Sequence, residues 1–386
     1  MNPLYQRMPV SVFERMSLAA AQHGAVNLGQ GFPDFGWPEQ IIESAVRFLR
    51  EASNQYAPSR GLPELRQAVT EHYRRNHRLD LGPEHVLITS GATEALAACI
   101  LALVQPGDEV IVIAPAYDAY APLIRRAGGV VREVALRPPE WRIEAAALRQ
   151  AVNERTRAIV FNNPHNPTGR LFGPEEMEAV AALAREHDLL VISDEVWEHV
   201  LLEDGPFVPM ASLPDMAPRV LKCGSAGKIF SLTGWKVGWL VADPELAAVV
   251  ARAHQFLTFA TPPNLQAAVA EGLHDADTWL PAMRARFSAA RDRTLRGLEA
   301  VGYRALPSAA TYFQCVDLRA SGIDFDDESF ATLAVEQAGV AVIPVSAFFE
   351  EAPVTNMVRL CFAKQDSTLD AGLAAMARAR ILAGAT

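Results

Sequence analysis

Short apolar runs alternate with amphipathic segments through the middle of the chain. The runs are rich in valine and isoleucine, as in EVIVIAP from Glu109 and LLVISD from Leu189, and such runs are typical of buried strands. The segments between them, such as GPEEMEAVAALAREHD from Gly173, have the periodicity of helices. This alternation predicts a parallel sheet that is covered by helices on both faces.

Helix and turn signals predict further elements before the first of these strands. Ser11 and Glu14 have the spacing of a capping box, which predicts a helix from Val12 to about Gln22, ended by Gly24. The pattern predicts two more helices over residues 39–51 and 63–76. The sequence that follows reads strand, glycine turn and long helix, so we expect a βα unit there.

The pattern changes around Thr278. A long arginine-rich amphipathic helix is followed by the short strand-like runs TYFQCVDL, VAVIPV and MVRLCFA and by two further helices. These elements predict a smaller α+β domain, and a chain of 386 residues is long enough for two domains. We therefore divide the chain into an N-terminal arm that joins the small domain (1–45), a large domain (46–277) and a C-terminal small domain (278–386).

The composition limits the classes of partner and the compartment. Half of the residues are hydrophobic, and 45 acidic against 35 basic residues give a formal net charge of -10. This charge argues against a nucleic-acid or anionic-membrane partner, since both bind basic surfaces. No secretory signal and no run of about 18 apolar residues is evident, so we expect a soluble, cytoplasmic protein. The four cysteines lie apart in apolar or glycine-rich sequence, which predicts reduced structural thiols and no metal site.

The stretch SAGKIFSLTGWKVGW carries the first candidate for chemistry. Its lysine Lys228 follows three small residues, which allow another molecule to approach the backbone closely. A lysine shielded from water at such a place suits Schiff-base chemistry with an aldehyde. The alternative is a loop lysine that lies beside glycine by chance. A second lysine, Lys236, follows in the same stretch.

An aldehyde cofactor such as pyridoxal 5'-phosphate (PLP) would need more than a lysine. Its ring requires an acid beside the pyridine nitrogen, a donor to the ring hydroxyl and an aromatic cover. Asp194 at the end of a strand, Asn166 in NNPHNPTG and Tyr117 in PAYDAY are the candidates. Each also has an ordinary explanation, namely a strand-end capping acid, an Asn-Pro turn and a core or surface tyrosine.

The phosphate of such a cofactor would need N–H donors and a cation. The turn at Gly91 leads into a helix whose first N–H groups, at Ala92 and Thr93, can hold an anion. Ser225 and Lys236 would add a hydroxyl and a positive charge. Because ligands bind at the carboxyl ends of parallel strands, we expect all these turns to meet at one side of the sheet.

With these residues in place, the chain resembles the class I aminotransferases, the PLP enzymes of fold type I. The stretches GQGFPDF, NQYAP, SAGKIFSLTGWKVGW, IPVSAF and RLCFAK carry the resemblance, which covers nearly the whole chain. The resemblance is closest to the branch of the family that includes the kynurenine–oxoglutarate transaminases and the bacterial methionine aminotransferases. The resemblance implies the α/β PLP-transferase fold of type I, with a mostly parallel sheet flanked by helices in the large domain and a smaller α+β domain.

The resemblance implies a role for each residue that would hold the cofactor. Lys228 would bind the aldehyde of PLP and later act as a general base, and Asp194 would pair with the pyridine nitrogen. Asn166 would contact the ring hydroxyl, and Tyr117 would stack on the ring. The phosphate would be held by Gly91, Ala92, Thr93, Ser225 and Lys236.

The resemblance also implies how the substrate is held. Arg359 would clamp the α-carboxylate, assisted by Asn166 and the backbone of Gly31. Tyr56 would reach the phosphate in the neighbouring subunit, which implies a homodimer with shared active sites. The side-chain pocket would be aromatic, formed by Phe13, Phe32, Trp37, Phe259 from the neighbouring subunit, and Phe348 or Phe349.

Two positions depart from the pattern of the family. The family usually has a tyrosine after Asp-Glu-Val that donates a hydrogen bond to the ring hydroxyl, and this chain has Trp197. The indole N–H is a donor only and lies elsewhere, so the contact to the ring hydroxyl is in doubt. Ala309 and Ala310 stand where the family often has glycine before Thr-Tyr-Phe, so we expect a local backbone difference.

The expected reaction is a two-step transamination between an amino-acid donor and a 2-oxo-acid acceptor. No second arginine for a distal carboxylate is evident, so the expected donors are methionine, aromatic amino acids, kynurenine or glutamine. The alternative reaction is carbon–sulfur β-elimination from cystathionine or cysteine conjugates, which would use nearly the same residues. A regulator built on this fold would need an attached DNA-binding domain, for which we see no residues to spare.

Overall fold

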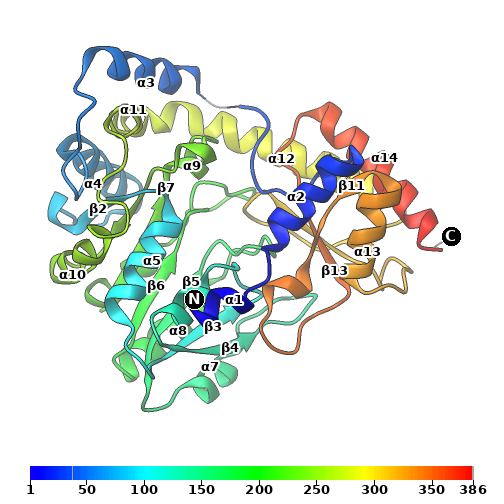
Figure 1. Ribbon diagram of the computed structural model, residues 1–386, viewed down its shortest axis with the longest axis horizontal. Coiled ribbons are helices and arrows are strands. Elements are labelled where there is room, and N and C mark those ends of the chain that lie inside the picture. The colour runs from blue at the N-terminus through cyan, green and yellow to red at the C-terminus, as the bar shows by residue number, and fades with distance from the viewer. Residues whose placement is uncertain (37, 385–386) are drawn as a thin grey trace.

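A seven-stranded sheet forms the centre of the larger part of the molecule (Figure 1). The computed structural model describes residues 1–36 and 38–384. In order across the sheet, the strands are β2 (Val86–Thr89), β8 (Gly238–Val241), β7 (Val220–Ser225), β6 (Leu190–Asp194), β5 (Thr156–Asn162), β3 (Glu109–Ala114) and β4 (Val130–Ala135).

The strands β7, β6, β5, β3 and β4 run parallel to one another, as the alternation of strands and helices predicts. β8 runs antiparallel to both β7 and β2, so the sheet is mostly rather than wholly parallel. All four residues of β8 are buried, and the strand directly follows the glycine-containing stretch after Lys228. A strand this short and buried on both faces has no polar alternation that would mark it in the sequence.

Alternate residues of the strands pack on opposite faces of the sheet. In β3, Val110 and Val112 join one core with α5 (Ala92–Leu103), α6 (Tyr120–Arg126) and α10 (Pro244–His254). Ile111 and Ile113 join another core with α7 (Ala145–Ala151) and α8 (Pro174–Glu186). At the β2–β8 end, α4 (Pro63–His77) and α11 (Pro263–His274) cover this second face. Both faces are therefore covered, as the apolar runs predict.

The first helices follow the predicted signals closely. α2 (Val12–His23) begins after Ser11, whose Oγ accepts a hydrogen bond from the Phe13 N–H at 3.4 Å. It ends at Gly24, which has the left-handed φ of 61° that glycine adopts without strain. α3 (Glu39–Glu51) has the predicted limits and packs against α11. A short helix, α1 (Pro3–Arg7), precedes them.

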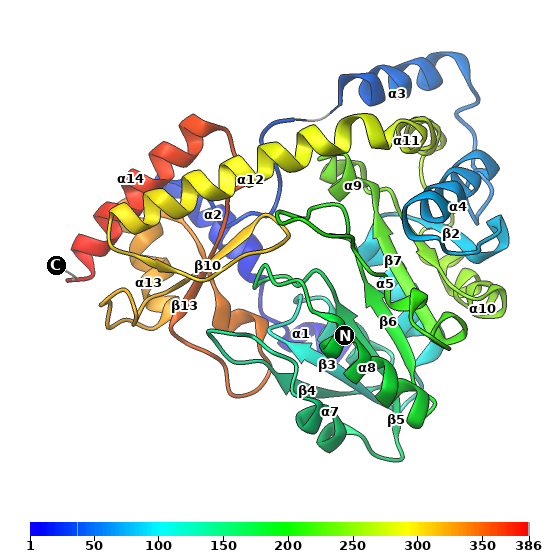
Figure 2. The same cartoon turned by 180° about the vertical axis from the view of Figure 1, so that it is seen from behind.

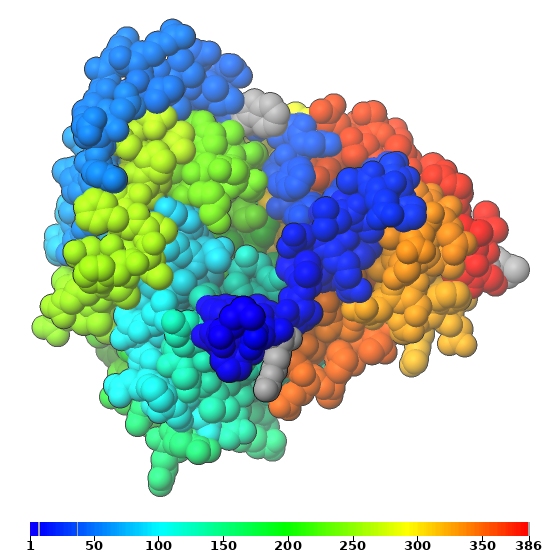
Figure 3. Space-filling model, in the orientation of Figure 1, coloured from blue at the N-terminus to red at the C-terminus, as the bar shows by residue number. Residues whose placement is uncertain are grey.

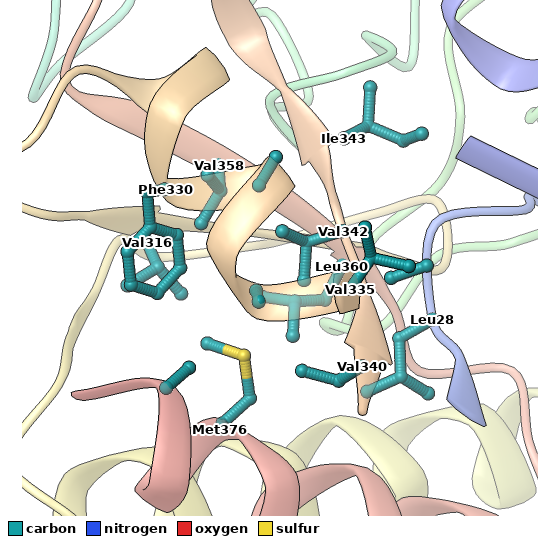
Figure 4. Close-up of a cluster of buried hydrophobic side chains, with 14 of the residues drawn as sticks. Leu28, Val316, Phe330, Val335, Val340, Val342, Ile343, Val358, Leu360 and Met376 are labelled. Carbon is teal, nitrogen blue, oxygen red and sulfur yellow. The ribbon is translucent and has the colours of Figure 1, made fainter. Parts of the chain in front are cut away.

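A smaller part holds a four-stranded antiparallel sheet in the order β12-β13-β10-β9 and a parallel pair, β1 with β11. Side chains such as Leu28, Phe330, Leu360 and Met376 form its core, which Figure 4 shows. Its elements are β1 (Val26–Asn27), β9 (Arg304–Ala305), β10 (Phe313–Asp317), α13 (Asp327–Leu333), β11 (Val340–Ala341), β12 (Ile343–Pro344), β13 (Met357–Cys361) and α14 (Asp366–Leu382).

One long helix and the N-terminal segment join the two parts. α12 (Ala276–Ala300) runs from α11 in the larger part to α14 in the smaller part (Figure 2). The N-terminal segment lies across the junction of the two parts, with α2 against the smaller one (Figure 3). The predicted boundary at residues 277/278 falls in the first turn of α12. The division into 1–45, 46–277 and 278–386 stays a prediction.

Two of the predictions from composition can be compared with this fold. All four cysteines are buried and unpaired, as predicted. Within residues 1–36 and 38–384, every helix is too short or too polar to cross a membrane.

Candidate active site

A cavity of about 420 Å³ lies where β5, β6 and β7 end and α5 begins. This size is within the range of about 300–1,000 Å³ that small-molecule sites usually have. The predicted site residues that line it are Phe13, Gly31, Phe32, Gly91, Ala92, Thr93, Tyr117, Asn166, Asp194, Ser225, Lys228, Lys236 and Arg359. The polar turns therefore meet at one side of the sheet, and segments from the smaller part close the opposite wall.

Lys228 lies in α9 (Ala226–Ile229), the short helix that follows β7. Its Nζ donates a hydrogen bond to the Tyr312 hydroxyl at 3.1 Å and lies 4.5 Å from the centre of the Trp197 ring. Burial lowers the pKa of Lys228 to about 8 from the usual 10.5. The uncharged fraction of this amine near neutral pH is therefore far larger than that of an ordinary lysine, as a nucleophile or a general base requires.

Asp194 ends β6 and faces the same cavity. Its Oδ2 accepts a hydrogen bond from the Tyr120 hydroxyl at 2.6 Å. Burial raises the pKa of Asp194, while the bond from Tyr120 and the positive charge of Lys228 act in the opposite direction. A buried carboxylate in this position suits a cationic partner, such as a protonated ring nitrogen.

The turn that carries Asp194 is anchored on its other side by an ion-pair cluster. The Nζ of Lys222, on β7, lies 2.8 Å from the Oε2 atoms of both Glu195 and Glu198. Lys222 is fully buried, and the two carboxylates hold its pKa well above the usual range despite this burial. Tyr73 donates a further hydrogen bond to Glu198 at 2.7 Å. The segment that begins at Asp194 thus presents Val196 and Trp197 to the cavity and two carboxylates to this cluster, which fixes the turn.

An anion-binding corner lies at the start of α5. Gly91 has φ 78°, and a Cβ built there would lie 3.6 Å from the Nζ of Lys236, so the lysine amine lies against this turn. The first N–H groups of the helix, at Ala92 and Thr93, have no acceptor earlier in the helix. Ser225 contributes its hydroxyl to the same wall of the cavity. Backbone donors, a hydroxyl and a cation together suit a phosphate.

Arg359 extends from β13 in the smaller part toward the cavity. It donates hydrogen bonds to Asn166 Oδ1 at 2.9 Å and to the Gly29 carbonyl at 2.8 Å. Its side chain is 1% exposed, and within the described chain its Nε has no hydrogen-bond partner. A buried guanidinium with a free donor beside an asparagine is arranged to receive a carboxylate.

Some predicted site residues are absent from the lining of this cavity, namely Tyr56, Phe259, Phe348 and Phe349. Tyr56 and Phe259 lie together on the surface, with ring centres 5.6 Å apart and exposures of 88% and 41%. Both were expected to act in a neighbouring subunit. Trp37 lies outside the described residues. Of the two remaining phenylalanine candidates, Phe348 packs on the lining residue Phe13 in an edge-to-face contact at 5.7 Å, and Phe349 lies near Arg137.

The two departures from the family pattern have visible consequences. Trp197 forms a wall of the cavity and packs edge-on against Tyr312, with ring centres 4.5 Å apart. The N–H groups of Ala309 and Ala310 both donate to the Gly169 carbonyl at 2.9 Å. The next residue, Thr311, has φ 64°, which is rare for a β-branched residue. The unusual backbone conformation therefore lies one residue after the alanines.

Sequence reasoning missed several residues at the site, and three of them form hydrogen bonds to predicted site residues. Tyr120 bonds to Asp194, and its signal was present as the second tyrosine of PAYDAY, three positions after Tyr117. Asn162, the last residue of β5, donates to the Asp194 carbonyl at 2.8 Å and lines the cavity. Tyr312 bonds to Lys228 across the two parts of the molecule, and no sequence pattern indicated this contact.

The residues of this site fit PLP. A lysine with a lowered pKa, a buried carboxylate and an anion-binding corner line one cavity together with Arg359, whose buried Nε has no hydrogen-bond partner within the described residues. The fold and the site thus define a PLP-dependent enzyme of fold type I.

Comparison with known proteins identifies the family. A family model described as "Aminotransferase class I and II" matches residues 24–376. The chain belongs to this family and is a PLP-dependent aminotransferase, as the resemblance in the sequence implied.

Three relatives illustrate the range of this similarity. The chain is 42% identical to the probable N-succinyldiaminopimelate aminotransferase DapC of Mycobacterium tuberculosis, over 93% of this chain and 94% of the relative. It is 37% identical to the methionine aminotransferase of Escherichia coli, over 99% of each chain. It is 35% identical to kynurenine–oxoglutarate transaminase 3 of Mus musculus, over 94% of this chain and 86% of the relative. The solved structure of the M. tuberculosis enzyme superimposes with a TM-score of 0.95, at 41% identity over 98% of this chain and 100% of that one.

Proposed function

We propose that this aminotransferase takes its amino group from a hydrophobic, aromatic or sulfur-containing amino acid and passes it to a 2-oxo acid. The observation that carries this proposal is the set of aromatic rings around Arg359. The guanidinium carbon lies 3.9 Å from the ring centre of Phe313, 5.1 Å from Phe13 and 5.2 Å from Phe348. A substrate whose carboxylate reaches Arg359 would therefore place its side chain beside apolar rings.

The residues have separate tasks in this proposal. Lys228 would bind PLP covalently, Asp194 would pair with its ring nitrogen, and the corner at Ala92, Thr93, Ser225 and Lys236 would hold its phosphate. Bound PLP supplies a sink for the electron pair that remains when a proton leaves the substrate Cα. Lys228, once displaced by the substrate amine, would accept that proton on Nζ. Arg359 and Asn166 would orient the substrate by its carboxylate.

The charges in the cavity bear on donors with a second carboxylate. Among its described lining residues, the cations are Lys228, Lys236 and Arg359. The first is the proposed base, the second adjoins the phosphate corner, and the third is the proposed clamp. A distal carboxylate would thus be buried without a cation of its own, which is costly.

A second candidate donor class comes from the family comparison. The M. tuberculosis relative, at 42% identity, is named a probable N-succinyldiaminopimelate aminotransferase. Its name implies a long donor with additional carboxylates. The aromatic rings and the lack of a further cation among the described lining residues favour the hydrophobic donors. The sequence identity favours this alternative, so the two donor classes should be compared in one experiment.

We expect a matrix of donors and 2-oxo-acid acceptors on the purified protein to separate these classes. Methionine, phenylalanine, kynurenine and glutamine should exceed aspartate and N-succinyldiaminopimelate in kcat/KM by at least about 100-fold, since an unpaired buried carboxylate costs about 3 kcal/mol or more. A preference of that size for either acidic donor would overturn the proposed class. Incubation with cystathionine in the absence of an acceptor tests the β-lyase alternative, which predicts pyruvate and ammonia.

We further propose that the enzyme is a homodimer in which Tyr56 and Phe259 complete the partner's site. Phe256 lies close in sequence to Phe259 and is 85% exposed, so this segment exposes a further large aromatic side chain. Large exposed aromatic side chains that lie together indicate a protein interface.

Sedimentation equilibrium is expected to give twice the chain mass. Phe256→Ser should raise the dimer dissociation constant by at least about tenfold, because aromatic residues dominate the binding energy of interfaces. Val130→Ser is the matched control, since Val130 is 43% exposed on the distant edge strand β4. A monomeric wild type, or equal weakening by both substitutions, would contradict the proposed interface.

A further inference from the structure

We infer that Tyr312 is a positioning residue that holds the amine of Lys228 in place for proton transfer and ties it to the loop that carries Gly31. This inference rests on the proposed function, because it assumes that Lys228 acts as the base. Tyr312 comes from the smaller part of the molecule, whereas Lys228 follows β7 in the larger part. The two residues meet at the cavity through a single hydrogen bond of 3.1 Å.

The direction of the hydrogen bonds is fixed by the chemistry of the phenol. Tyr312 is fully buried, and burial raises its pKa well above the usual value, so the hydroxyl keeps its single proton. That proton is donated to the Gly31 carbonyl, with Oη and the carbonyl oxygen 2.7 Å apart. Toward Lys228 the hydroxyl oxygen is therefore an acceptor, and Lys228 must donate.

This arrangement suits a lysine that has to accept a proton. A neutral amine that donates one N–H to Tyr312 keeps its lone pair free in another direction. During proton transfer the substrate Cα–H bond breaks and its proton forms a new N–H bond on Lys228, while its electron pair is left on the substrate side, where bound PLP would supply the sink. The ammonium so formed retains the acceptor oxygen of Tyr312, which stabilises the charge inside a buried site.

Trp197 makes this acceptor more important in this chain. The indole ring lies 4.5 Å from Lys228 Nζ, but its N–H can only donate. Within residues 1–36 and 38–384, the Tyr312 hydroxyl is the one hydrogen-bond acceptor of the Lys228 amine. The ring of Trp197 also packs edge-on against Tyr312 and so limits where the phenol can point.

The backbone before Tyr312 is held in a strained conformation. Thr311 has φ 64° and is fully buried. Its N–H donates to the Val200 carbonyl at 2.8 Å, and its Oγ1 accepts from the Phe313 N–H at 3.1 Å. A β-branched residue in this region costs about 1–3 kcal/mol, and such strain is retained mainly at functional sites. The strain directs the next side chain, Tyr312, at Lys228.

The link to Gly31 connects this base to the substrate site. Three carbonyls of the Gly29–Phe32 loop accept hydrogen bonds from distant side chains, namely Gly29 from Arg359, Gly31 from Tyr312 and Phe32 from Lys364. Arg359 is the proposed carboxylate clamp. Tyr312 thus forms hydrogen bonds both to the base, Lys228, and to the loop that Arg359 holds. These bonds fix the position of the base relative to that of the substrate.

The test compares Tyr312→Phe with Tyr303→Phe. Tyr303 is also buried and donates its hydroxyl to a backbone carbonyl, that of Met376 at 2.9 Å, far from the cavity. Tyr312→Phe keeps the packed ring, and Gly31, whose carbonyl loses its donor, is only half-buried, so the variant should fold. One readout is the rate at which PLP-free protein takes up PLP, followed by near-visible absorbance between pH 6 and 10.

The expected wild-type uptake rises with pH around a midpoint near 8, the pKa of Lys228. Tyr312→Phe should lower this midpoint by about half to one pH unit, because the ammonium loses an acceptor that favours the charged form. It should also lower kcat by about 10- to 100-fold with KM within about threefold, because the base is misplaced while the carboxylate clamp remains. Tyr303→Phe should leave the midpoint, kcat and KM at their wild-type values.

Only a lower pH midpoint of PLP uptake together with the loss of kcat in Tyr312→Phe supports the inference. A raised KM with an unmoved midpoint would show that Tyr312 merely anchors the Gly31 loop, and any other combination also overturns the positioning role. A wild type that neither takes up PLP nor transaminates would instead refute the proposed function, before the variants are compared.

Discussion

Lys228→Ala is expected to abolish the near-visible absorbance of the purified protein and to reduce kcat by at least about 10³-fold, since both the covalent attachment and the general base are lost. Lys228 is the only lysine that combines a place in the cavity with a pKa lowered to about 8 among the described residues. The measurements are an absorbance spectrum of the purified variant with added PLP and a transamination assay at saturating donor.

The variant should remain folded, which makes the loss interpretable. Within the described residues, the one hydrogen bond of Lys228 is to the neutral Tyr312 hydroxyl, and the buried Asp194 carboxylate keeps its hydrogen bond from Tyr120 when the lysine charge is removed. Circular dichroism is therefore expected to match the wild type. Lys236→Met is the matched control from the same stretch. It should release PLP more readily but show the near-visible band when PLP is saturating, because Lys236 supplies charge and not the covalent bond. A normal spectrum in Lys228→Ala would refute the assignment.

The layered fold could be predicted because each element leaves a local signal. The valine- and isoleucine-rich runs become β3 and β6, and the capping residues at Ser11 and Gly24 mark the ends of α2. β8 could not be predicted in this way. Its four residues are buried on both faces, and its direction depends on pairing with β7 and β2, which are separated from it in sequence.

The site residues that could be predicted are those that lie at the end of a strand or at the start of a helix. Asp194, Ser225 and Ala92 are of this kind, because strand ends in a parallel sheet converge. Tyr312 is different, since its contact with Lys228 joins segments 84 residues apart and depends on the positive φ of Thr311. Such a backbone conformation at threonine has no signature in the sequence. Tyr56 differs again, because its side chain lies on the surface of a single chain and its predicted contact would be with a neighbouring subunit.

Asp194→Asn is the second substitution for which we expect a large effect, again through kcat. The amide keeps the shape of the side chain and an oxygen to accept from Tyr120, but the negative charge that would pair with the ring nitrogen of PLP is lost. Losing one partner of a buried ion pair costs about 3–5 kcal/mol, which corresponds to about 10²- to 10³-fold or more in rate. Single-turnover kinetics with a hydrophobic donor measures the proton-transfer step directly.

Tyr120→Phe is the control that separates charge from position at Asp194. It removes the 2.6 Å hydrogen bond to Oδ2 but leaves the carboxylate, which the turn anchored by Lys222 and the Val196 N–H still hold. We therefore expect a smaller loss of about tenfold in kcat, which is the lower end of the effect of one hydrogen bond to a charged group. Both variants should retain the near-visible band, because Lys228 is intact. Equal losses in the two variants would show that orientation rather than charge matters, and unchanged single-turnover rates in Asp194→Asn would exclude its pairing with the cofactor ring.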